Sequence, residues 1–248
     1  MIKKLVPVLA ALAFASVGLA TSAAADGPSV PPGLASSGTG WNTEHYTIDG
    51  ATYHENSLPH GQTYTISFTD AASRTRLDPY ALAAARQLNA IPSIVAAGIH
   101  FAVTTVLSPN PEPAGAVYPS ACPASYRISL SLHKSAQSGM SWTDNCYTNW
   151  RFSRGADIWV TPEYWSTSHW FSTNPTVNTV RINAVVPHEI GHSIGLDHPA
   201  AFTVPAGRAV PLMVPTVGGY QSIENSSKNP YTAYDITGIN ALVANGAK

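Results

Sequence analysis

The segment HEIGHSIGLDH at residues 188–198 constrains this chain more than any other feature of its sequence. Within a helix, His188 and His192 lie one turn apart on the same face, so two imidazoles can reach one metal ion. Gly195 can adopt a left-handed backbone conformation and end the helix, after which the chain turns back and brings His198 to the metal as a third ligand. Three histidine ligands leave one position open, which is typical of a catalytic zinc site.

Glu189 directly follows the first of these histidines and lies about 100° round the helix from it, because one turn takes 3.6 residues. Its carboxylate can therefore flank the metal without binding it, as a general base for a water at that metal requires. Two histidines and one glutamate on a helix can also form a solvated face. The glycine and the third histidine at the required distances favour the metal site over that alternative.

At its full length the segment resembles the zinc-binding motif of the metzincin metallopeptidases. Met213, in the sequence PLMVP, follows His198 by 15 residues, where metzincins carry a tight turn with a methionine beneath the zinc. An isolated methionine would indicate only an adaptable core residue. HEIGHSIGLDH followed by LMVP is most similar to the matrixin branch, and residues 234–242 resemble the closing helix of that branch. The resemblance covers about residues 60–248, and its specific part is confined to residues 188–242.

The resemblance implies an α+β fold, in which a twisted mixed β-sheet carries an active-site helix and a C-terminal helix. The order of elements in the sequence, taken alone, indicates only the α+β class. Asp78 followed by Pro79 predicts a helix that begins there and ends near Asn89. Apolar alternation and turn residues predict strands at residues 61–70, 99–106, 128–132 and 154–161.

The final predicted helix has recognisable ends. Thr232 and Asp235 form the pattern of a capping box at its start, and Gly246 is a suitable stop. The resemblance gives Asp235 the further role of holding the methionine turn. The alternative is a solvated carboxylate that the helix dipole favours.

Pro187, directly before the motif, departs from a simple helix. Inside a helix it removes one backbone hydrogen bond and crowds the preceding turn. Either the active-site helix begins near Pro187, where proline is tolerated, or the helix is kinked there. The preceding residues 178–186 fit a helix or a strand.

The first 25 residues have the pattern of a secretory signal peptide. Lys3 and Lys4 form a positively charged start, residues 5–20 are apolar, and three alanines precede Asp26. A membrane anchor is the alternative, but the apolar run is short for a bilayer span and proline-rich polar sequence follows it. We therefore expect a secreted, extracellular protein with no membrane anchor.

The remaining sequence divides into two parts. Residues 26–60 are rich in glycine, proline and serine near their start and predict a linker or pro-segment. Residues 61–248 form the expected zinc metallopeptidase catalytic domain, and the mature chain of about 223 residues is long enough for one sizeable core.

The charge balance argues against nucleic acid as a partner. Removal of Lys3 and Lys4 lowers the formal net charge from −1 to −3, so the mature chain has no excess of basic residues to bind phosphates. The resemblance implies a protein or peptide substrate, and we expect a monomer. It also allows a calcium ion, although no segment is acidic enough to define its site.

Cys122 and Cys146 are the only cysteines. In an exported protein such a pair is expected to be bridged. The bridge would close a loop of about 25 residues and stabilise the fold by roughly 3 kcal/mol in the chain-entropy model. The alternative, two zinc-binding thiolates, lacks further cysteine or histidine partners at ligand spacing.

Taken with the resemblance, these residues predict a secreted zinc-dependent endopeptidase. Three histidines would hold Zn²⁺, Glu189 would act as the base, and Met213 would support the site without touching the metal. A catalytically weak secreted binding protein on the same scaffold is the main alternative, and the intact Glu189 argues against it. A zinc hydrolase acting on a non-peptide amide is a further alternative that the motif itself leaves open.

Overall fold

The computed structural model describes residues 45–48, 51–54, 57–137, 139–148, 152–166, 170–196, 198, 211–214 and 229–247. The elements are β1 (His45–Ile48), β2 (Ala51–His54), β3 (Thr63–Phe68), α1 (Ala71–Leu88), α2 (Pro92–Ala96), β4 (His100–Leu107), β5 (Arg127–Leu132), β6 (Trp142–Thr148), β7 (Phe152–Val160), the 3₁₀ helix η1 (Pro162–Trp165), α3 (Pro175–Ser193) and α4 (Ala233–Gly246). The expected α+β class is confirmed.

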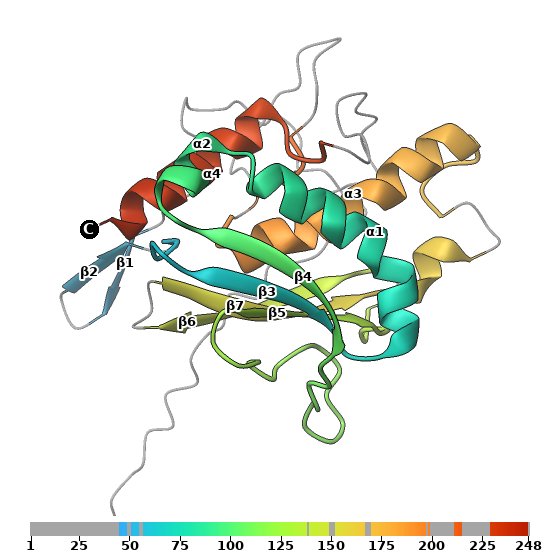
Figure 1. Cartoon of the computed structure of the whole chain (residues 1–248). Helices are drawn as coiled ribbons and strands as arrows, with labels where there is room; N and C mark the ends of the chain where they lie inside the picture. Colours follow the sequence, from blue (N-terminus) through green and yellow to red (C-terminus); the bar gives the residue numbers. More distant parts are fainter. Residues whose placement is uncertain are drawn as a thin grey trace, which may run out of the picture.

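Five of the strands form one mixed sheet in the order β4-β3-β5-β7-β6. β3 is parallel to β4 and β5, and β5 is parallel to β7, whereas β6 is antiparallel to β7. Helices α1 and α3 lie over one face of this sheet, and the segment between β4 and β5 runs over the other face (Figure 1). β6 is therefore an edge strand of the sheet, and β1 and β2 form a separate antiparallel hairpin.

The main core lies between the sheet and the helices because the strands alternate in polarity. Tyr64, Ile66 and Phe68 of β3 have no exposed surface, as their spacing predicts. The same face continues through β5 and β7, and α1 covers it with a stripe of leucine and alanine. These core residues include Ile128, Leu130, Ala156, Ile158, Leu77, Ala81 and Leu88.

The predicted start of the first helix was wrong. α1 begins at Ala71 rather than near Asp78, because Asp70 caps it: the carboxylate accepts a hydrogen bond from the Ser73 backbone N–H at 2.8 Å and another from the Ser73 hydroxyl at 2.7 Å. Pro79 therefore lies inside the helix, where its ring nitrogen has no proton to donate. The predicted end near Asn89 is confirmed, since Asn89 is the C-cap.

The four predicted strands are all present as β3, β4, β5 and β7, with their ends shifted by a few residues. The elements that were not predicted are β1, β2, β6, α2 and η1. β6 has the sequence WTDNCYT, which lacks the apolar alternation of a half-buried strand. α2 is a single short helix that begins at Pro92, where the sequence indicated only the stop of the preceding helix.

Pro187 lies within α3, so a helix start at Pro187 was the wrong alternative. The helix begins at Pro175 instead, with Asn174 as its N-cap. The Asn174 side chain accepts hydrogen bonds from the backbone N–H groups of Thr176 at 3.0 Å and Val177 at 3.4 Å. A proline in the first helical position is favourable, because the helix does not need its N–H there.

Two contacts outside the sheet tie distant parts of the chain together. Leu58 is fully buried and its N–H donates to the carbonyl of Leu242 at 3.1 Å, so residues just before position 61 also pack on this fold. Cys122 and Cys146 lie at disulfide distance, as expected, with their Cα atoms 5.8 Å apart. The pair fastens the segment between β4 and β5 to the edge strand β6.

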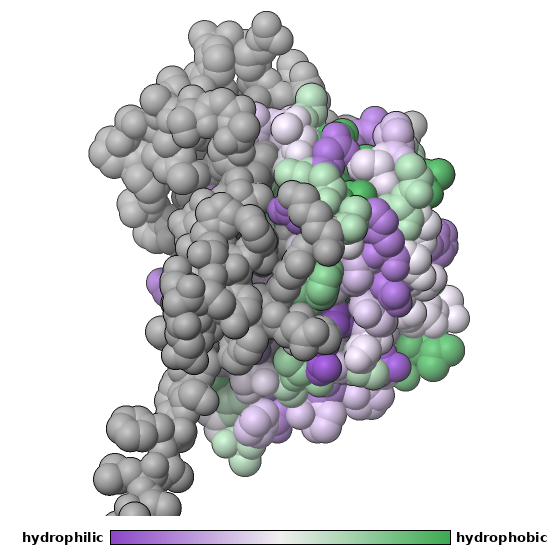
Figure 2. Space-filling model, turned by 90° about the vertical axis from the view of Figure 1, so that its left-hand side faces the viewer, coloured by the Kyte–Doolittle hydropathy of each residue, from purple (hydrophilic) through white to green (hydrophobic). Residues whose placement is uncertain are grey.

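In the part of the chain that the structure describes, no helix is long and apolar enough to span a bilayer. On the side seen in Figure 2, hydrophobic residues are scattered among hydrophilic ones. The expected signal peptide at 1–25 and most of the expected linker or pro-segment lie outside the described residues.

Candidate metal centre

The last two turns of α3 carry the first part of the centre. His188 and His192 are buried, with 0% and 1% of their surface exposed, and they project from one face of the helix. Gly191 lies between them on the inner side of the helix. A Cβ atom at Gly191 would overlap the sulfur of Met213, so the glycine allows the close approach of that side chain.

The helix then ends in a way that returns the chain toward His188 and His192. Gly195 has a φ of +105°, in the region that favours glycine. Its N–H donates to the carbonyl of His192 at 2.8 Å, and the N–H of Leu196 donates to the carbonyl of Gly191 at 3.0 Å. These two bonds are those of a Schellman motif, and the predicted glycine turn is confirmed. The turn brings His198 back toward the helix.

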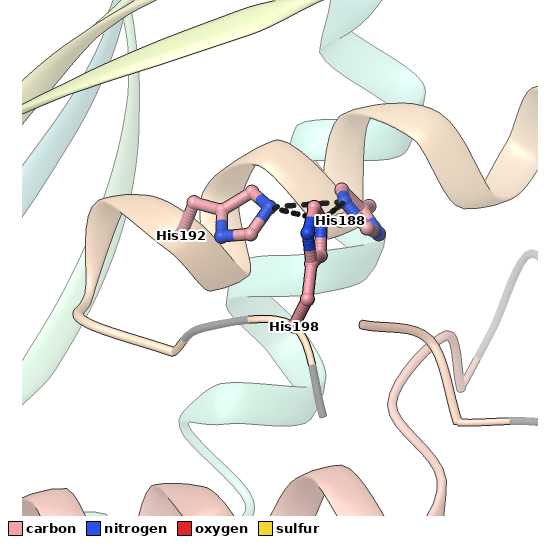
Figure 3. Close-up of side chains that lie close together, drawn as sticks. All are labelled: His188, His192 and His198. Atoms are coloured by element: carbon pink, nitrogen blue, oxygen red, sulfur yellow. Dashed lines mark hydrogen bonds between the residues drawn. The ribbon is translucent and has the colours of Figure 1, made fainter. Parts of the chain in front are cut away.

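The three histidines converge, as the motif predicts. The Nε2 atoms of His192 and His188 are 3.0 Å apart, those of His192 and His198 are 3.1 Å apart, and those of His198 and His188 are 3.3 Å apart. Figure 3 shows the three rings with these nitrogens pointing at one another. The histidines therefore lie close enough to bind one metal ion.

The hydrogen bonds of two rings determine which nitrogen faces the others. Nδ1 of His188 lies 2.7 Å from the carbonyl oxygen of Leu212, and Nδ1 of His192 lies 2.8 Å from that of Leu196. A carbonyl oxygen only accepts, so each Nδ1 carries a proton and donates it. In a neutral ring Nε2 then carries a lone pair, as a metal ligand must.

The environment keeps these rings neutral. Burial and the neighbouring His192 lower the pKa of His188 to about 3, and burial and His188 lower that of His198 to about 3. Burial, followed by the nearby His198, lowers the pKa of His192 well below its usual value. Neutral Nε2 atoms of His188 and His192 cannot donate to each other, so a cation is the natural partner for the lone pairs that meet here.

Glu189 lies beside this group and is 1% exposed. Its Oε2 atom accepts a hydrogen bond from the hydroxyl of Thr143 in β6, at 2.6 Å. Burial raises the pKa of Glu189 to about 8, while the Thr143 hydrogen bond acts in the opposite direction. Positive charge placed at the histidines would favour the ionised carboxylate and lower this pKa.

Met213 lies in a turn beneath the centre, with no exposed surface. The turn is held by Asp235 at the start of α4, whose carboxylate accepts hydrogen bonds from the N–H groups of Leu212 at 2.9 Å and Met213 at 3.2 Å. Leu212 in turn accepts from His188, so Asp235 supports a histidine through one intervening residue. The role suggested for Asp235 agrees with these contacts, and the solvated alternative is wrong because Asp235 is fully buried.

The same carboxylate also caps α4. Oδ2 of Asp235 accepts from the backbone N–H and from the hydroxyl of Thr232, each at 2.7 Å. The capping box predicted at Thr232 is confirmed, and so is the helix end at Gly246. Burial raises the pKa of Asp235 to about 6, although its hydrogen bonds with Leu212, Thr232 and Met213 act in the opposite direction.

Sequence reasoning missed three supporting groups: the hydroxyl of Thr143 and the carbonyls of Leu196 and Leu212. The Leu196 carbonyl follows from the glycine turn, so the motif contained a signal for it. The contacts of Thr143 and Leu212 join residues more than 20 positions apart, and no local pattern marks them. This chain matches no family model, no curated protein and no solved structure.

Proposed function

We propose that this chain is a zinc-dependent endopeptidase of the matrixin-like metzincin type. The observation that carries the proposal is the convergence of three neutral imidazoles next to a buried glutamate. A buried histidine cluster without a neighbouring base would suit a structural metal. A base within the same helix turn supports a hydrolytic role instead.

Zinc is the metal that fits this donor set best. Three Zn–N bonds of 2.0–2.1 Å at tetrahedral angles would separate the nitrogens by about 3.3–3.4 Å. The observed separations of 3.0, 3.1 and 3.3 Å are close to that spacing. Imidazole also suits copper, iron and nickel, but a set of three histidines with an open fourth position is characteristic of catalytic zinc.

The arrangement of the elements supports the metzincin resemblance. The chain follows the expected order of strand, helix, further strands, histidine-bearing helix, methionine turn and final helix. The methionine turn lies under the histidine helix, as the resemblance implies. Within the described residues, the histidines form the one cluster of three or more side chains that could hold a metal, so no second cluster supports the calcium ion that the resemblance allows.

The side chains divide the proposed reaction between them. Zinc held by the three histidines would polarise the scissile carbonyl group and acidify a water molecule. Glu189 accepts the proton of the attacking water and later donates it to the leaving amine. The Nδ1 hydrogen bonds of His188 and His192 fix the orientation of their rings, and Met213 supports the floor of the site.

We further propose that the enzyme is secreted, acts on proteins or peptides as a monomer, and loses residues 1–25 on export. The basis is the signal-like start of the sequence together with the cysteine pair, since disulfides persist mainly in oxidising compartments. Sequencing of the N-terminus of the exported protein tests this point.

Digestion of a diverse peptide library by the purified mature protein tests the function. We expect cleavage that a zinc chelator abolishes and that added zinc restores. Zinc-loaded protein that cleaves no peptide would favour the catalytically weak binding protein. Cleavage that persists after verified removal of all metal would contradict the proposed role of the histidines.

A further inference from the structure

Thr143 occupies a special position in the edge strand β6. Its side chain points toward α3, whereas the next residue, Asp144, pairs with Asp157 and points to the opposite face of the sheet. Thr143 has no exposed surface. A hydroxyl buried this deeply needs a hydrogen-bond partner, and Thr143 finds it in α3 rather than in its own sheet.

Both described partners of the Thr143 hydroxyl belong to Glu189. The oxygen Oγ1 lies 2.6 Å from Oε2 of the carboxyl group and 3.2 Å from the backbone carbonyl oxygen of the same residue. Among the described residues, Thr143 is the one whose side chain makes a hydrogen bond to the Glu189 carboxyl group. One oxygen of the proposed base is thus held, and the other is left for the reacting water.

The chemistry of a hydroxyl allows the contact with Oε2 to persist through the reaction. A threonine hydroxyl has one proton to donate and two lone pairs that accept. When Glu189 is a carboxylate, Thr143 donates to Oε2. After the other oxygen of Glu189 has taken a proton, Oε2 keeps a lone pair and still accepts the proton of the Thr143 hydroxyl. Both forms of Glu189 therefore keep a hydrogen bond without movement of either side chain.

We propose that Thr143 is a positioning residue for the base: its hydroxyl holds Glu189 in one orientation while the carboxyl group accepts and returns the proton of the reaction. This inference rests on the proposed function. It names a residue outside the zinc-binding motif, from a strand that packs against the helix carrying that motif. Thr143 acts through Glu189 and touches neither the histidines nor the reacting atoms in this account.

A merely structural role for Thr143 makes a different prediction. If the hydroxyl only stabilised the fold, its loss would lower stability and metal content and leave the turnover of correctly folded enzyme unchanged. A positioning role affects kcat, because orientation matters most when the proton moves. It leaves KM and the zinc content near their original values, since neither depends on the Glu189 orientation.

Thr143→Val tests the proposal, because valine keeps the branched shape and removes the hydroxyl. Thr143→Ser keeps the hydroxyl. Thr161→Val removes the hydroxyl of another fully buried threonine, one that caps η1 and bonds to Glu163 rather than to the centre. In zinc-loaded protein we expect Thr143→Val to lower kcat roughly 10- to 100-fold, the effect of one hydrogen bond to a charged group. The serine variant and the Thr161 control should retain kcat close to that of the parent.

Crystal structures of the zinc-loaded variants supply a readout that does not depend on activity. We expect the Glu189 carboxyl group to leave its position in Thr143→Val and to keep it in Thr143→Ser, with the histidines unmoved in both. If Thr143→Val does not fold, Thr143→Ala removes the same hydroxyl. Unchanged kcat with Glu189 in place, or equal loss in the serine variant, would overturn the inference. A parent protein that binds zinc and cleaves no peptide would instead overturn the proposed function.

Discussion

Two aspartates on opposite sides of the central sheet are equally buried and differ in their hydrogen bonds. Asp235, on the helix side, accepts from the N–H groups of Leu212, Met213 and Thr232 and from the Thr232 hydroxyl. Asp157 lies in β7 on the other side and is 1% exposed, and its carboxyl group faces the carboxyl group of Glu112, with no backbone N–H to stabilise its ionised form. Depth of burial therefore does not decide what a carboxylate does for the fold.

The two sites also differ in the form of the carboxyl group that they stabilise. Burial and the neighbouring Glu112 carboxyl group raise the pKa of Asp157 to about 8. Burial raises the pKa of Asp235 only to about 6, because several donors favour its ionised form. Asp235 thus fastens the methionine turn to α4, whereas an ionised Asp157 is unfavourable for folding.

Replacing each aspartate by asparagine should give the largest difference between the two sites, measured as the change in the free energy of unfolding. Asp235→Asn replaces one acceptor oxygen with an NH₂ group that faces buried donors, and we expect a loss of about 2–4 kcal/mol in the free energy of unfolding. Asp157→Asn should cost less than about 1 kcal/mol at neutral pH, or stabilise, because asparagine is neutral in both states and avoids the cost of taking up a proton on folding. Urea unfolding of the zinc-free proteins measures both.

Zinc affinity provides a second readout for the same pair. Asp235→Asn should weaken zinc binding, because the turn that it holds carries the carbonyl partner of His188. Asp157→Asn should leave zinc affinity unchanged, since it lies on the far side of the sheet. Equal losses of stability and of zinc affinity in the two variants would contradict the different roles given to Asp235 and Asp157.

A smaller effect is expected in the pH dependence of the free energy of unfolding. The pKa of Asp157 rises from 3.8 to about 8 on folding, so between these values the folded protein keeps a proton that the unfolded chain has lost. The stabilising contribution of this proton is full below about pH 4 and is lost as the pH rises through about 8. We expect the stability of Asp157→Asn relative to the parent to increase over that range. Unfolding free energies measured at several pH values check this.

Two other carboxyl groups titrate in the same pH range, so the pH experiment compares the variant with the parent protein. Burial and then Glu112 also raise the pKa of Asp144 to about 6, and Asp235 titrates in the same range. Both residues are present in parent and variant, so the difference between the two proteins isolates the Asp157 site, including its coupling to Glu112. A difference in stability that stays constant from pH 4 to pH 8 would show that Asp157 is ionised in the folded protein.

The sequence was most informative where the interactions are local. The spacing of His188 and His192, the glycine turn at Gly195 and the capping box of Thr232 with Asp235 each depend on residues within one or two turns, and each was predicted. The convergence of the three histidines follows from the same local geometry. The resemblance to metzincins then supplied the link between the helix and Met213.

Non-local interactions explain the predictions that failed. Pro79 and Pro187 both lie inside helices, where local rules favour a helix start, because packing of these helices on the sheet outweighs one lost hydrogen bond each. β6 lacks an apolar pattern because it is an edge strand, and its partner β7 supplies the pairing. Thr143 could not be recognised as part of the site without β6.

The central claim is that three histidines hold a zinc ion while Glu189 acts as the base. The most direct test compares cleavage and zinc content in Glu189→Ala and His192→Ala. Glu189→Ala should lower the rate of cleavage on the order of 10²- to 10⁴-fold and leave zinc bound, because it removes the base and no ligand. The His192→Ala protein should lose both zinc and cleavage activity. Near-normal turnover in Glu189→Ala, or equal zinc loss in both variants, would contradict the account.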